Sequence, residues 1–109
     1  MAFIYHLAKP SDWEKALEKG SYEHISLQEE GFIHCSTKEQ LLPTANIHFK
    51  DEQELVVLFI SERLVKGTLK WEESRNGELF PHIYGKIQLK HVENTRILFK
   101  DKEGKWEWD

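Results

Sequence analysis

The sequence predicts an α+β domain with a mixed, largely antiparallel sheet and with its helices mainly in the N-terminal half. The expected elements follow the order β-α-β-α-β-β-β-β, so helices and strands are largely segregated along the chain. The segment 54–61, ELVVLFIS, is a continuous apolar run, which is typical of a strand buried on both faces. A length of 109 residues suits one domain, and we expect residues 1–109 to form it.

The N-terminal elements follow from alternation and capping signals. Residues 2–8, AFIYHLA, predict a strand in which His6 lies on an otherwise apolar face. Ser11 with Glu14 forms a capping-box pattern, which predicts a helix beginning there. Gly20 is the expected left-handed residue at the end of that helix.

The central stretch predicts a short strand between two helix starts. Ser26 opens a second capping box just before Gly31, and residues 32–36 then predict a strand. In that strand His34 and Cys35 would point to opposite faces, so we interpret Cys35 as a small apolar residue and not as a thiolate activated by His34. Ser36 begins a third capping box, and we expect Pro43 to kink or split the helix that follows.

The second half of the chain predicts mainly strands. Asn76-Gly77 is a turn signal, and Asp101 to Gly104 predict a hairpin loop that leads to Trp106 and Trp108. The expected strands are 54–61, 68–73, 87–92 and 95–100. If residues 82–85 are extended, His82 and Tyr84 share one face.

Composition narrows the class of protein. The formal net charge is −4, which makes nucleic acid an unlikely partner, because proteins that track phosphates usually need a basic face. The single cysteine cannot form an internal disulfide. No segment suggests a signal peptide or a membrane span. We therefore expect a cytoplasmic protein that is a monomer and has no membrane partner.

Two stretches carry the polar side chains that suggest function: residues 30–37, EGFIHCST, and residues 77–85, GELFPHIYG. We expect them to face each other across a pocket for a small molecule. Imidazoles and hydroxyls hydrogen-bond sugars, a helix start receives phosphate, and a tyrosine stacks on a planar ring. Glu78 could stabilise positive charge on a sugar carbon as a glycosidic bond dissociates.

Two alternatives to an enzyme of this kind stay open. One is a non-catalytic module that binds a small metabolite or an anion in the same pocket. The other is a metal-dependent enzyme, for which His6, His34 and His82 could converge with Glu78. It has less support, because neither a His-x-x-x-His pair nor a Cys-x-x-Cys pair occurs, and we predict no metal ligands.

Several motifs of the chain resemble those of a known family. They are Glu-Gly-Phe-Ile-His-Cys-Ser, Phe-Pro-His-Ile-Tyr-Gly, Ile4-Tyr5-His6, Thr44-Ala45-Asn46 and Trp71-Glu72. The chain resembles the bacterial domain-of-unknown-function family 952 from about residue 3 to about residue 92, followed by a C-terminal hairpin at about 95–108. The fold of that family is similar to the ADP-ribosyltransferases, which implies a split sheet and a cleft for nicotinamide adenine dinucleotide (NAD).

The resemblance implies roles for individual residues. His6 would hold NAD, Ser36 and Thr37 would support the pocket, and Glu78 would bind the ribose and orient the acceptor. NAD would then be a substrate, and we assign no certain cofactor. Glu78 and His34 are the candidate catalytic residues, and the candidate ligand-binding residues are His6, Ser36, Thr37, His82 and Tyr84.

Overall fold

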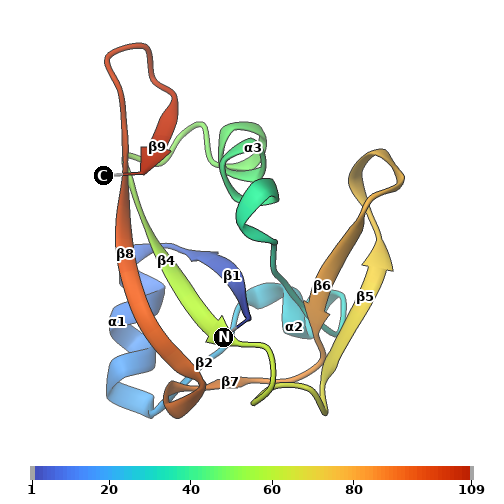
Figure 1. The fold of residues 1–109 in the computed structure, drawn as a ribbon. Helices are drawn as coiled ribbons and strands as arrows, with labels where there is room; N and C mark the ends of the chain where they lie inside the picture. The colour runs from blue at the N-terminus through green and yellow to red at the C-terminus, as the bar shows by residue number, and fades with distance from the viewer. Residues whose placement is uncertain (1, 109) are drawn as a thin grey trace.

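A computed structural model describes residues 2–108, and Figure 1 shows how their elements are arranged. The helices are α1 (Pro10–Lys19), α2 (Ile25–Glu29) and α3 (Lys38–His48), with 3₁₀ turns η1 (Arg75–Gly77) and η2 (Leu89–His91). The strands are β1 (Phe3–Ala8), β2 (Ser21–Tyr22), β3 (Ile33–His34), β4 (Glu54–Ser61), β5 (Leu69–Glu73), β6 (Leu79–Ile83), β7 (Ile87–Gln88), β8 (Val92–Lys100) and β9 (Trp106–Trp108).

The strands form three sheets, in the orders β1-β4-β8-β9, β2-β7 and β3-β6-β5. All pairings between the described strands are antiparallel, so the α+β class and the antiparallel character are confirmed. The parallel pairs that a mixed sheet would contain do not occur among them. Figure 1 shows the four-stranded sheet on one side, the β5–β6 hairpin on the other, and α3 between them.

Strand β4 lies at the centre of the core, as its apolar run predicts. Leu55 and Val57 pack on one face with a cluster that includes Trp106, whereas Val56 and Leu58 pack on the other face with a second cluster. Burial of each such side chain contributes roughly 1.5–3 kcal/mol. Apolar clusters therefore pack on both faces of the four-stranded sheet at β4.

His6 joins the three sheets. It lies on β1 and is buried, and its Nδ1–H donates to the backbone carbonyl of His34 on β3 at 2.6 Å. Its Nε2 accepts the hydroxyl proton of Tyr22 on β2 at 2.8 Å. Both bonds suit the neutral ring, and burial is the main cause that lowers the pKa of His6 to about 4.

The helix starts differ from the predicted ones. Helix α1 follows Lys9, whose side chain makes no capping hydrogen bond, and it begins with proline, whose φ and missing N–H both suit a first position. His24 caps α2, because its ring nitrogen accepts the N–H of Ser26. Thr37, not Ser36, caps α3 in a capping box with Gln40. The predicted left-handed end of α1 at Gly20, with φ 87°, is confirmed.

Three predicted segments also need correction. Helix α3 is not split, and it continues through the exposed Pro43. The strand expected at 32–36 is reduced to β3, after which Ser36 forms only an isolated bridge to Tyr5. The strand expected at 87–92 is interrupted by η2, because the chain must pass from β2, the partner of β7, to β4, the partner of β8.

We predict that His6 makes the fold sensitive to acid. The unfolded chain binds a proton at this ring near pH 6.5, whereas the folded chain binds it near pH 4. The contribution of His6 to the free energy of unfolding is therefore complete above pH 6.5 and is lost as the pH falls to 4, by an amount on the order of 3 kcal/mol.

Urea unfolding between pH 8 and pH 4 tests this, with H6Q as the variant and H91Q as the matched control. H6Q should be less stable at pH 8 but should lose less stability on acidification than the wild type or H91Q does. Parallel pH profiles for H6Q and the wild type would contradict the prediction.

Candidate functional site

A cavity of about 240 Å³ opens between α3, β1, β3 and the turn that joins β5 to β6, and we call it the histidine cavity. The residues that line it are His6, Leu7, His24, His34, Cys35, Ser36, Thr44, His48, Phe49, Ser74, Arg75 and Phe80. Four histidines and one arginine therefore come together from five separate segments of the chain. None of the described lining residues is an aspartate or a glutamate.

The histidines of the cavity are held in different ways. His24 Nδ1 accepts the backbone N–H of Ser26 at 3.1 Å, so in the neutral ring the proton is on Nε2. Burial is the first cause that lowers the pKa of His24. His34 keeps 48% of its side chain exposed, and its Nε2 lies 2.9 Å from Glu30 Oε2. His48 comes from the last turn of α3 and is exposed.

Arg75 supplies the permanent positive charge of the cavity. Its Nη1 donates to the hydroxyl of Thr44 on α3 at 3.2 Å, and its guanidinium lies 5.2 Å from the centre of the Phe80 ring. The three ion pairs found within residues 2–108 do not include it. A guanidinium with several free donors beside a cavity is suited to a carboxylate or a phosphate.

The structure brings three of the predicted site residues together in the cavity, namely His6, His34 and Ser36. Thr37 is adjacent, but its hydroxyl accepts the N–H of Gln40 at 3.2 Å and so serves as a cap. Cys35 is 3% exposed, and burial raises the pKa of its thiol. This agrees with the interpretation of Cys35 as an apolar residue.

His82 and Tyr84 form a second group with Glu72, which we call the Glu72 cluster. His82 Nδ1 donates to Glu72 Oε1 at 2.8 Å, and the Tyr84 hydroxyl donates to the same oxygen at 2.6 Å. The bond from Tyr84 is the first cause that lowers the pKa of the Glu72 carboxyl, and it also raises the pKa of Tyr84. His82 Nε2 is buried and has no hydrogen-bond partner among the described residues.

The Glu72 cluster adjoins the histidine cavity through His34. The His34 ring lies edge-on to the His82 ring, with centroids 5.2 Å apart, and Phe32 stacks on His82 at 4.2 Å. The two polar stretches are therefore neighbours in one sheet, where His34 on β3 is the register partner of His82 on β6, and they do not face each other across a pocket as predicted.

Glu78 belongs to neither group, although its backbone is hydrogen-bonded to Ser74 and Arg75, which line the cavity. It is exposed, stands between η1 and β6, and does not line the histidine cavity. The carboxylate beside His82 is Glu72, because the antiparallel register places Lys70 opposite His82 and Glu72 opposite Phe80. Alternation in the segment LKWEE and the Asn76-Gly77 turn are the signals that could have placed Glu72 on this face. The catalytic role of Glu78 stays a prediction.

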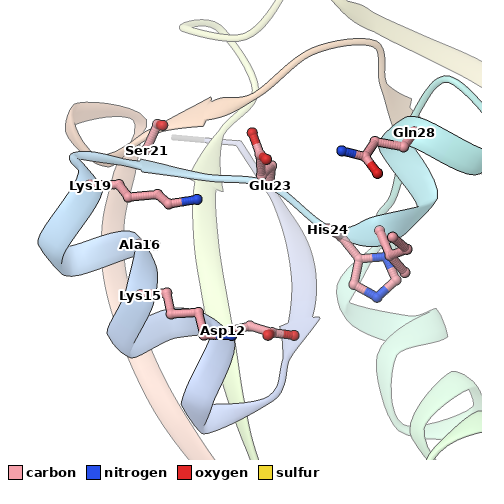
Figure 2. A pocket seen from close by; sticks show the side chains of 9 residues that line it. Asp12, Lys15, Ala16, Lys19, Ser21, Glu23, His24 and Gln28 are labelled. Carbon is pink, nitrogen blue, oxygen red and sulfur yellow. The ribbon is translucent and has the colours of Figure 1, made fainter.

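A second hollow, the side groove, has a volume of about 190 Å³ and lies between α1, β2 and α2. Figure 2 shows charged side chains of both signs around it, with Lys15 and Asp12 from α1 and Glu23 after β2. His24 lines both the side groove and the histidine cavity. One imidazole thus forms part of the wall of two hollows.

Two further findings concern residues 2–108. No group of three or more histidine, cysteine, aspartate or glutamate side chains in that range is arranged to hold a metal ion. No helix there is both long and apolar enough to cross a membrane.

The chain is similar to a protein of solved structure. Its sequence is 31% identical to that of protein CC0527 from Caulobacter crescentus. Its fold matches a crystal structure of that protein with a TM-score of 0.88, over 97% of this chain and 94% of that one. A solution structure of the same protein gives 33% identity and a TM-score of 0.84 over 96% and 91% of the two chains. No curated protein matched. A family model described as "Protein of unknown function (DUF952)" matches residues 7–95. The motifs of the two polar stretches, the fold and this match agree, and the chain belongs to the DUF952 family.

Proposed function

We propose that the histidine cavity binds a small anionic metabolite, such as a sugar phosphate, without transforming it. The observation that carries this proposal is Arg75, a guanidinium that lines the cavity and enters no ion pair within the described chain. A non-catalytic binding module of this kind is one of the two alternatives that the sequence leaves open.

The other polar groups of the cavity complement an anion that carries hydroxyls. Neutral His24 keeps Nε2–H as a donor, and Ser36 and Thr44 add hydroxyls to the lining. A hydrogen bond to a charged group contributes about 1.5–3 kcal/mol, and a cavity that lacks carboxylates adds no repulsion. The charged guanidinium and the neutral donors together therefore favour a ligand that carries a phosphate or a carboxylate and also hydroxyl groups.

The size of the cavity limits how large a ligand it can enclose. A volume of about 240 Å³ is below the roughly 300–1,000 Å³ of pockets for drug-sized ligands. A complete dinucleotide such as NAD would have to extend beyond the cavity, past His34 and towards Tyr84, which is 37% exposed. Tyr84 would then contact the outer part of such a ligand, whereas His82 is only 4% exposed.

Transfer of ADP-ribose, which the family resemblance implies, has less support. It needs a carboxylate near the sugar carbon that becomes positive. Glu78 is exposed and does not line the cavity, and Glu72 already accepts hydrogen bonds from His82 and Tyr84. Binding without transfer agrees better with these positions.

We predict that R75Q weakens the binding of ribose 5-phosphate by about tenfold or more, since it removes a charged hydrogen-bond donor. The dissociation constant can be measured by NMR titration that follows the rings of His24, His34 and His48. R63Q, which changes an arginine outside the cavity, should bind as the wild type does. The absence of any shift at these rings with millimolar ribose 5-phosphate would contradict the proposal.

We also predict that the protein releases no nicotinamide from millimolar NAD, and that E78Q changes the affinity for ribose 5-phosphate less than twofold. Proton NMR detects free nicotinamide directly over hours of incubation. Release that disappears in E78Q would contradict binding without transfer and would support the transferase that the resemblance implies.

A further inference from the structure

Strand β5 has an edge with which no other strand in residues 2–108 pairs. It pairs with β6 on one side, and β3-β6-β5 ends with β5. Figure 1 shows β5 at the outer side of the molecule. An unpaired edge strand presents backbone N–H and C=O groups that can pair with another chain.

The register identifies which residues present those groups. Thr68 O accepts from Tyr84 N at 2.8 Å, and Ser74 N donates to Glu78 O at 2.9 Å, so the even-numbered residues of this hairpin face β6. Trp71 lies opposite Pro81, which has no N–H and whose carbonyl accepts from Cys35 on the β3 side. The backbone groups of the odd-numbered residues 69, 71 and 73 therefore point outwards.

This edge is complementary to itself. An antiparallel pairing of two copies centred on Trp71 places Trp71 opposite Trp71, Leu69 opposite Glu73, and Lys70 opposite Glu72. The three odd-numbered positions are those with outward backbone groups, so the register forms a complete hydrogen-bonded ladder. Lys70 and Glu72 lie on one face and meet their opposite charges twice, which stabilises the pairing.

The other face of the edge offers room for the partner. Trp71 is 40% exposed and lines a hollow of about 570 Å³ together with Arg63 and Lys66. In the symmetric register the second tryptophan lies beside the first, on the same face as this hollow. Paired aromatic rings would be removed from water there, beside Arg63, Lys66 and Glu62.

We propose that β5 is a self-association surface, through which two copies of the chain join their β3-β6-β5 sheets into one six-stranded antiparallel sheet. The sequence alone favours a monomer, but it does not reveal that the outward groups of residues 69, 71 and 73 share one edge. The inference is independent of the ligand proposed for the histidine cavity. A five-residue edge makes a small interface, so the dimer is of the weak class.

Cross-linking tests the register. In W71C the two cysteines would face each other across the symmetry axis, with Cα atoms about 5.5 Å apart, which suits a disulfide. In the matched control E73C the two cysteines would lie more than about 13 Å apart along the strand. Under mild oxidation W71C should become a covalent dimer, and E73C should form no covalent dimer at the same concentration. Cys35 is buried and should not react.

Sedimentation equilibrium of the wild type up to about 1 mM tests the association itself. We expect dimers at the upper concentrations. K70E should weaken the dimer about tenfold, because two attractive pairs become repulsive, whereas K102E in the β8–β9 loop should not. A wild type that stays monomeric at about 1 mM, or equal cross-linking of W71C and E73C, would overturn the proposal.

Discussion

The pair of hydrogen bonds made by the His6 ring is the interaction on which the rest of the structure depends. Each sheet other than that of β1 is small, and β2 and β3 each contain two residues. Such short strands are not stable by themselves. The bonds from His6 to Tyr22 and to the carbonyl of His34 fasten both to β1 through a single buried side chain. The backbone bridge between Tyr5 and Ser36 adds a second attachment to β1 just after β3.

That attachment also separates two roles that histidines have in this protein. His6 is buried and neutral, and its two nitrogens are occupied within the fold. His34, whose backbone His6 binds, keeps its ring at the cavity and near solvent. His6, whose ring is fully hydrogen-bonded within the fold, thus positions His34, whose ring remains available to a ligand. The same division applies to Thr37, which caps α3, and Ser36, which lines the cavity.

Much of the fold could be predicted from local patterns, but the helix starts could not. Three Ser-x-x-Glu/Gln-like patterns occur, and in each case a neighbour competes for the cap. Pro10 suits the first position of α1, His24 reaches the N–H of Ser26, and Thr37 forms the box with Gln40. The free-energy differences between adjacent caps are about 1 kcal/mol, so tertiary packing decides among them.

The site was predictable only where a polar residue stands out in the pattern of its own segment. His6, His34 and Ser36 stand out because they interrupt apolar strands. Arg75 and His48 carry no such signal, since they reach the cavity only when the β5–β6 turn lies against α3. Glu72 and Glu78 look equivalent in the sequence, and only the register of the hairpin distinguishes them.

His24 has a consequence that extends beyond the cap it provides. Its ring borders both the histidine cavity and the side groove, while its Nδ1 must stay unprotonated to accept the N–H of Ser26. Any molecule that changes the protonation or orientation of this ring from one hollow changes the free energy of occupying the other. Thermodynamic reciprocity then requires the second occupant to affect the first by the same factor. Ligands bound in the two hollows would therefore be coupled through a single imidazole, because His24 lines both.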